Sequence, residues 1–156
     1  MTISTLARAL GKLPSGLFIL TARHKDSETG MLASWVMQAG FEPPMISVAL
    51  RRDRFIVRWL TPEMPFVINV IADGQKTLLS HFGRGFDEGE PAFKGVELRA
   101  VWRDVPVLAG TAGYLECVAR DHVDSGDHRI LTAEVIGGHA EDVEPWVHLR
   151  SNGLRY

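Results

Sequence analysis

Hydrophobic residues at the start of the chain recur with the period of a helix. The apolar side chains stand three and four positions apart, at Ile3, Leu6, Leu10 and Leu13. Ser and Thr are preferred at helix N-caps, so Thr2 or Ser4 is suited to begin this segment, and Pro14 to end it. The pattern predicts a helix with its apolar residues on one face.

Most of the remaining chain has the pattern of short β-strands. Runs rich in Val, Ile, Phe and Trp are separated by Gly, Pro and Asp, and they cover residues 16–24, 31–38, 45–50 and 65–71. Apolar and polar residues alternate from Val96 to Arg103, which predicts a strand with one buried and one solvated face. Alternation recurs in two segments joined by a turn at residues 124–127, so we expect a long hairpin of residues 115–120 and 128–136.

Two further segments, residues 53–60 and 74–82, have a helical period. Many short strands with only two or three helices predict a mostly β protein with peripheral helices. Closure of the sheet removes exposed strand edges, which otherwise invite aggregation. We therefore expect a closed or partly closed antiparallel β-barrel, formed by a single domain over residues 1–156.

Composition limits the range of partners. The chain has 17 Lys and Arg against 19 Asp and Glu, for a formal net charge of −2, which gives no basic excess for nucleic acid or an anionic membrane. A small molecule or a protein is the expected partner. The single cysteine, Cys117, is typical of a reducing compartment, and the apolar run at residues 17–20 is too short for a signal peptide or a membrane span. These features predict a cytoplasmic protein.

Several catalytic and binding motifs are absent. Gln75 stands where a phosphate-binding loop requires Gly before its Lys, the glycines at 83, 85 and 89 miss the dinucleotide-binding spacing, and no G-x-S-x-G occurs. Three histidines lie near aspartates, at His122, His128 and His139, but their spacing fits no standard metal motif. We expect no metal site, although a haem- or metal-binding barrel that uses these histidines is one alternative.

Small residues suggest a ligand site within residues 30–50. This stretch contains two strand-like runs hinged at residues 41–44, with small side chains at Ala33, Ser34, Ala39 and Gly40. A strand wall with little bulk lets a flat ligand lie against the backbone and hydrogen-bond its amide groups. Arginines that follow nearby elements are candidates for a phosphate, with a solvated turn as the alternative reading: Arg51, Arg52, Arg54 and Arg84.

Six segments occur in an order that resembles the flavin reductase-like family. They are LGKLPSGL at residues 10–17, GMLASW at 30–35, FVINV at 66–70, HFGR at 81–84, YLEC at 114–117 and GDH at 126–128. Members of this family have the FMN-binding split-barrel fold. The matching segments span nearly the whole chain and look most similar to the flavin reductase domain at the C-terminus of multidomain flavodiiron proteins.

The resemblance implies a homodimer with one FMN per subunit near the dimer interface, FAD being the other option. NADH or NADPH would reduce the flavin, and electrons would pass to an acceptor such as an oxygenase or flavodiiron partner. The implied flavin contacts are Met31, Leu32, Ala33, Ser34, Trp35, Ala49, Leu50, Phe82, Gly83 and Arg84, with Arg54 on the phosphate. His128 matches the histidine near the nicotinamide site and is the implied catalytic residue.

Two features keep a second interpretation open. Many family members have Thr and Asn where Leu32 and Ser34 stand, so fewer side-chain hydrogen bonds to the flavin are available here, which bears on phosphate affinity and on the choice of FMN or FAD. The chain also has no recognisable nicotinamide-binding motif. The alternative is a non-catalytic FMN-binding electron-carrier module of the same fold. The ending Gly153-Leu154-Arg155-Tyr156 resembles that of the family, and Tyr156 is expected either to pack over the site or to close the barrel.

Overall fold

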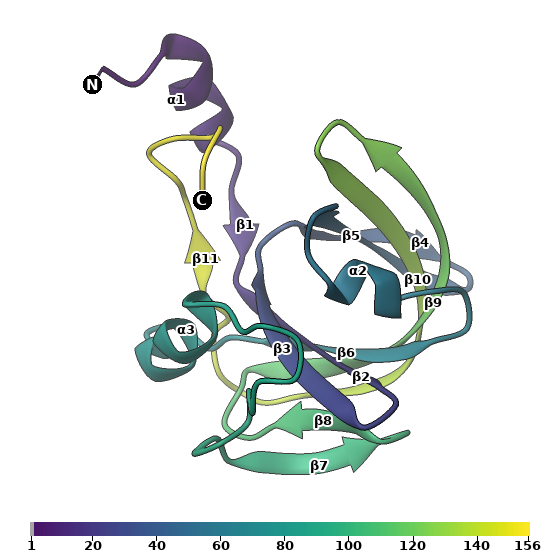
Figure 1. The fold of residues 1–156 in the computed structure, drawn as a ribbon. Coiled ribbons are helices and arrows are strands. Elements are labelled where there is room, and N and C mark those ends of the chain that lie inside the picture. Colours follow the sequence, from purple (N-terminus) through teal and green to yellow (C-terminus); the bar gives the residue numbers. More distant parts are fainter. Residues whose placement is uncertain (1) are drawn as a thin grey trace.

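The computed structural model describes residues 2–156, and Figure 1 shows a mostly antiparallel β structure with peripheral helices. Seven strands form one curled sheet in the order β3-β2-β6-β9-β10-β5-β4. Their bounds are Phe18–His24 (β2), Ser27–Ala33 (β3), Val36–Phe41 (β4), Pro44–Arg51 (β5), Pro65–Val70 (β6), Gly113–Ser125 (β9) and His128–Ala140 (β10). The expected antiparallel barrel is confirmed, and so is the long hairpin, which is formed by β9 and β10.

The barrel is split between its two edge strands, which do not hydrogen-bond to each other. β3 and β4 follow each other in the chain, yet they are the two ends of the strand order and do not pair. Residues Ser34 and Trp35 connect them, and the carbonyl of Trp35 accepts a hydrogen bond from the Ala49 amide at 2.9 Å. The single strand expected over residues 31–38 is therefore wrong, because the chain leaves one edge at residue 33 and begins the other at residue 36.

The other elements surround the barrel (Figure 1). Helix α2 lies across one end, α3 lies beside β3, and a separate hairpin runs along the outside, while α1 projects from the barrel with the short β1–β11 pair. The bounds are Thr5–Gly11 (α1), Ser15–Gly16 (β1), Ile56–Trp59 (α2), Lys76–Gly83 (α3), Leu98–Trp102 (β7), Val105–Leu108 (β8) and Val147–His148 (β11). All three expected helices are present, and the second is shorter than predicted.

The main core fills the barrel interior. Inward-facing side chains from six strands pack with Ile56 and Trp59 of α2, which close one end. They include Leu20, Val48, Phe66, Ile68, Cys117 and Leu131, all buried. Burial removes apolar surface from water and supplies most of the stabilisation.

Strands β2 and β6 are covered on both faces, which explains their nearly continuous apolar sequences. Ile19 points outward and packs with Phe82 of α3, while Val67 points outward against Val105 of β8. The buried polar Asn69 fits there because it is fully hydrogen-bonded: its Nδ2 donates to the Ile19 carbonyl at 2.9 Å and its Oδ1 accepts from the Leu108 amide at 2.9 Å. This side chain fastens the outer hairpin to the barrel.

Two apolar faces are not buried. Strand β7 forms within the predicted segment, but Leu98 and Ala100 of its expected buried face are exposed, because β7 pairs only with β8 and β8 is the strand that packs on the barrel. Helix α1 begins as expected, with the Ser4 side chain accepting from the Ala7 amide. Its buried residues, however, are Ala7 and Gly11. Residues 3–16 together with β11 form a projecting arm, and the large apolar residues on this arm are exposed at Ile3, Leu6 and Leu13.

Candidate functional site

A cavity of about 370 Å³ lies where β3, the end of β5, α3 and the C-terminal segment meet. Its volume is within the range of small-molecule and cofactor sites, about 300–1,000 Å³. The lining residues come from parts of the chain that are far apart in sequence: Leu17, Met31, Leu32, Ala33, Ser34, Ala49, Leu50, Arg51, Arg54, Leu79, Phe82, Gly83, Gly85, Trp146, His148, Arg150 and Tyr156.

A glycine in β3 brings α3 to the cavity wall. A Cβ atom at Gly30 would lie 2.5 Å from the Phe82 ring, which is far inside van der Waals contact. Only the absence of a side chain at residue 30 lets α3 pack this closely on β3. The close approach places Phe82 and Gly83, at the end of α3, on the wall of the cavity.

The wall formed by the barrel has little bulk. Ala33, Ser34 and Ala49 line the cavity at the ends of two strands. Strand β3 pairs only with β2, so the main-chain groups of its other edge are not used in the sheet. A planar molecule can lie against such a wall and hydrogen-bond main-chain N–H and C=O groups.

The small residues further along this stretch have a different role. Ala39 and Gly40 do not line the cavity, contrary to the idea that one wall extends to residue 40. A Cβ at Gly40 would lie 3.3 Å from the Cβ of Met45, beside the irregular pairing of β4 and β5. Gly40 is therefore explained by the hairpin rather than by the cavity.

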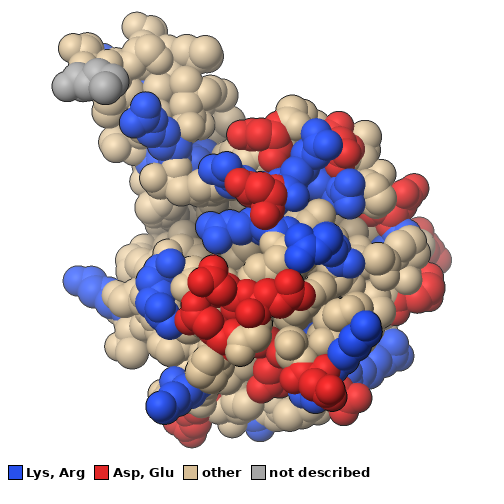
Figure 2. All heavy atoms as spheres, viewed as in Figure 1, with Lys and Arg blue, Asp and Glu red and all other residues tan. Residues whose placement is uncertain are grey.

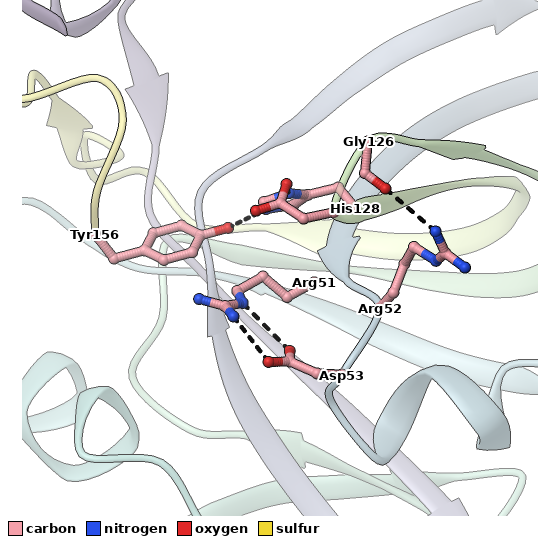
Figure 3. A network of polar contacts seen from close by, with 7 residues as sticks. Arg51, Arg52, Asp53, Gly126, His128 and Tyr156 are labelled. Atoms are coloured by element: carbon pink, nitrogen blue, oxygen red, sulfur yellow. Dashed lines mark hydrogen bonds and ion pairs between the residues drawn. The ribbon is translucent and has the colours of Figure 1, made fainter.

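The cavity is electropositive. Arg51, Arg54 and Arg150 line it with His148, and no Asp or Glu is among its described lining residues. Arg51 is held by Asp53 at 2.8 Å, and this hydrogen bond raises the pKa of its guanidinium (Figure 3). For Arg54 and Arg150 no ion pair is found within residues 2–156, so both cations remain available to an anion such as a phosphate.

Two of the expected flavin contacts lie outside the cavity lining. Trp35 lies behind it, with its ring 4.6 Å from the His128 ring and 5.0 Å from the Arg150 guanidinium carbon. Arg84 is 60% exposed in its side chain, pairs with Glu90 at 3.4 Å and stacks on Phe86 at 4.2 Å. The other expected contacts, including Arg54, line the cavity.

His128 is also outside the lining, and it is buried next to it. Its Nδ1 lies 2.6 Å from Oδ1 of Asp127 and its Nε2 lies 2.6 Å from the hydroxyl of Tyr156 (Figure 3). The hydrogen bond with His128 lowers the pKa of Asp127. Tyr156, rather than His128, faces the cavity.

No group of three or more His, Cys, Asp or Glu is placed to hold a metal ion within the part of the chain that the structure describes. His139 pairs with Glu141 at 3.1 Å, away from His128 along the same hairpin. Among residues 2–156 no helix has the length and apolar character needed to cross a bilayer.

Comparison with known proteins identifies the family. Residues 10–153 match the family described as "Flavin reductase like domain". The chain belongs to the flavin reductase-like domain family. This domain covers nearly the whole chain, and the resemblance noted in the sequence is confirmed.

Curated relatives of this flavin reductase-like domain are longer proteins. The chain is 36% identical over 154 residues to "Putative diflavin flavoprotein A 3" of Nostoc sp. PCC 7120, covering 97% of this chain and 27% of that protein. It is 35% identical over 156 residues to "Diflavin flavoprotein A 1" of Synechocystis sp. PCC 6803, covering 98% of this chain and 27% of that protein. The chain thus spans about a quarter of the length of these relatives.

Solved structures show the same fold. "Streptomyces globisporus C-1027 NADH:FAD oxidoreductase SgcE6" superposes with a TM-score of 0.85 at 25% identity, covering 92% of this chain and 86% of that one. "Flavin reductase PheA2 in native state" has a TM-score of 0.79 at 19% identity, over 96% and 94% of the two chains.

Sequence reasoning missed most of one wall of the site in this flavin reductase-like domain. The C-terminal segment supplies Trp146, His148 and Arg150 to the cavity. They are placed there because β11 pairs with β1, which joins His148 to Ser15 across most of the chain. No local pattern signals such a pairing. The family-like ending at Tyr156 was the one available signal for this wall.

Proposed function

We propose that this flavin reductase-like domain is an NAD(P)H-dependent flavin reductase that binds flavin in the described cavity. FMN is the proposed flavin, with FAD as the other option, and NADH or NADPH is the reductant. One observation carries the proposal. In a chain of this family, a mostly apolar cavity has a barrel wall of small side chains and, among the described residues, is lined by three arginines and no carboxylate. The name of SgcE6 specifies NADH and FAD for that protein, which supports the same chemical class here.

The lining residues fit a planar, anionic ligand. The ring would lie against Ala33, Ser34 and Ala49, where the Ser34 hydroxyl is a further donor. Leu50 and Phe82 would cover its apolar faces and exclude water. Arg54 would bind the phosphate, since its guanidinium lines the cavity without a carboxylate partner among the described residues.

The chemistry asks little of the protein's own acids and bases. A bound flavin supplies the hydride acceptor and stores the electrons. The chain's residues would hold the reductant against the ring and surround the site with positive charge, which favours negative charge on the ligand. The proposed reaction therefore needs no catalytic dyad, and the lining contains none.

The downstream acceptor is proposed from the relatives. Their names are diflavin flavoproteins, and each is about four times as long as the region it shares with this chain. We therefore favour a flavodiiron partner over an oxygenase component. Residues 1–156 would act in the cytoplasm as one domain, in line with the buried free thiol of Cys117.

A homodimer is proposed from the projecting arm. On the face of the molecule that Figure 2 shows, the arm carries few charged residues, whereas charges of both signs are interspersed over the barrel. Leu6 and Leu13 are 62% and 66% exposed on it, and a second copy would cover them. Analytical ultracentrifugation should find a dimer that Leu6→Asp/Leu13→Asp converts to monomer. Val123→Asp, at an exposed residue on the barrel, should leave the dimer intact, and a monomeric wild type would contradict this proposal.

Absorption spectroscopy tests the proposed function directly. Purified protein with added FMN should show a flavin spectrum shifted from that of free FMN, and anaerobic NADH or NADPH should bleach it. Bound flavin that neither nicotinamide bleaches would favour the electron-carrier alternative. Protein that neither binds flavin nor oxidises NAD(P)H would refute the proposed function.

A further inference from the structure

Tyr156 contacts the rest of the protein through its hydroxyl group and through its ring, whose centroid lies 5.8 Å from that of Trp35. The C-terminal segment is anchored as far as Gly153, whose amide donates to the Ala7 carbonyl at 2.7 Å. Beyond this point residues 154–156 are exposed, and Tyr156 itself is 70% exposed. Its O–H nevertheless reaches Nε2 of His128 at 2.6 Å, as Figure 3 shows. An exposed aromatic ring thus lies beside Trp35 and is held at its far end by one hydrogen bond.

His128 is held in a way that orients this bond. The residue is 9% exposed, and Asp127 and Tyr156 occupy its two ring nitrogens. The Asp127 carboxylate accepts a hydrogen bond from Nδ1–H, which leaves the lone pair of Nε2 to accept a hydrogen bond from the Tyr156 hydroxyl group. Packing of Trp35 against the imidazole at 4.6 Å further restricts its rotation. Asp127, His128 and Tyr156 form one hydrogen-bonded chain.

Tyr156 lies on the boundary between two hollows. It lines the main cavity and also a neighbouring open hollow of about 350 Å³, whose lining residues are Arg51, Asp53, Arg54 and Tyr156. Under the proposed function, the flavin and the reductant would share this region, because hydride transfer requires their rings in contact. Tyr156 lines both hollows together with Arg51 and Arg54, and its ring is the aromatic group at their boundary.

We propose that Tyr156 is a hinged cover over the cavity and that His128 and Asp127 are positioning residues that hold it closed. This inference rests on the proposed function. The closed ring retains flavin, and the reductant enters when the Tyr156–His128 hydrogen bond breaks and residues 154–156 swing aside. His128 thus acts on the reaction through Tyr156 rather than by touching the nicotinamide.

Matched variants test the cover. Tyr156→Phe and His128→Leu each remove the hydrogen bond, and each should raise the dissociation constant of flavin about tenfold while lowering KM for the nicotinamide, with kcat changed less than about twofold. His128→Gln keeps an acceptor near the position of Nε2 and should stay within about threefold of wild type. Because one bond links the pair, the double variant should be no worse than either single variant.

A second Tyr–His pair, which lies on the β9–β10 hairpin, provides a control. Tyr114 and His139 have ring centroids 6.1 Å apart, the same separation as His128 and Tyr156, and His139 also pairs with a carboxylate, Glu141. Neither residue lines the cavity. Tyr114→Phe and His139→Leu should leave flavin affinity and KM unchanged.

A readout without flavin separates the cover from the proposed function. The chain has two tyrosines, so fluorotyrosine labelling gives two ¹⁹F signals, assigned by Tyr114→Phe and Tyr156→Phe. In flavin-free protein, His128→Leu should move and sharpen the Tyr156 signal alone. An unchanged Tyr156 signal, or wild-type flavin affinity and KM in Tyr156→Phe, overturns the cover. A responsive signal in a protein that binds no flavin refutes the proposed function and, with it, the role assigned to the cover.

Discussion

Gly30→Ala perturbs the contact that joins α3 to the barrel. The added Cβ would lie 2.5 Å from Cε1 and 2.9 Å from Cδ1 of Phe82. Ordinary carbon–carbon contacts are about 3.5–4.0 Å, so the ring must retreat by roughly 1 Å. Phe82 is 1% exposed and packs against Phe86 and Phe93, with ring centroids 5.9 Å away in both cases, so a shift of the ring disturbs these contacts or pushes the ring into the cavity that it lines.

The expected cost follows from this overpacking. Extra carbon in a packed core costs about 1–3 kcal/mol. The smaller conformational entropy of Ala in the unfolded chain returns about 0.4–1 kcal/mol, so the net loss of unfolding free energy is centred on about 1 kcal/mol. Gly83→Ala is the matched control, because its Cβ would meet only Leu32, at 3.7 Å, and Ala favours the helical conformation. The two glycine substitutions should change stability in opposite directions.

Urea denaturation followed by tryptophan fluorescence measures both effects. Gly30→Ala should lower the midpoint. The double variant Gly30→Ala/Phe82→Leu should lose less unfolding free energy than the sum of the losses in the two single variants. Because Phe82 and Gly83 line the cavity, Gly30→Ala should also weaken flavin binding. A Gly30→Ala protein as stable as wild type would refute the close packing of β3 and α3.

Three further predictions concern single side chains. Asn69→Leu should lower the unfolding free energy by about 2–4 kcal/mol in urea denaturation, because it leaves the buried Leu108 amide without an acceptor, and wild-type stability would contradict this. Arg54→Met should weaken FMN binding about tenfold in fluorescence titrations and leave riboflavin, which has no phosphate, unaffected; equal losses would exclude the phosphate contact. Burial raises the pKa of Cys117 to about 12, so thiol ionisation favours the unfolded state as the pH rises above about 8.5. Cys117→Ala should therefore lose less thermal stability than wild type between about pH 9 and 11. Equal losses in the two proteins would contradict this prediction.

Sequence patterns correctly predicted the elements whose burial depends on residues nearby in the chain. The β9–β10 hairpin has local alternation and a local turn, so its strands were found, whereas β7 was assigned a buried face because nothing local shows that β8 stands between it and the barrel. Likewise α1 has the expected period, but Leu6 is 62% exposed, and the partner proposed for it is a second copy.

The candidate site divides in the same way. Residues 31–34 are consecutive in β3 and the turn that follows it, so one short motif identified them together. Arg84 stood next to a predicted contact in sequence, yet the chain turns at the end of α3 and directs it to Glu90. Arg51 was a candidate from its place after a strand and does line the cavity, whereas Arg150 reaches the cavity near the pairing of β11 with β1, which residue spacing does not encode.

The central claim is that flavin binds against the wall of small side chains formed by β3 and β5. The most direct test is a fluorescence titration of FMN into wild-type protein and Ala49→Phe, because residue 49 lines the cavity and the larger side chain fills the space proposed for the ring. Wild type should bind one FMN per chain, and Ala49→Phe should remain folded but bind at least about tenfold more weakly. Equal affinity in the two proteins, or no binding to wild type, would contradict the account.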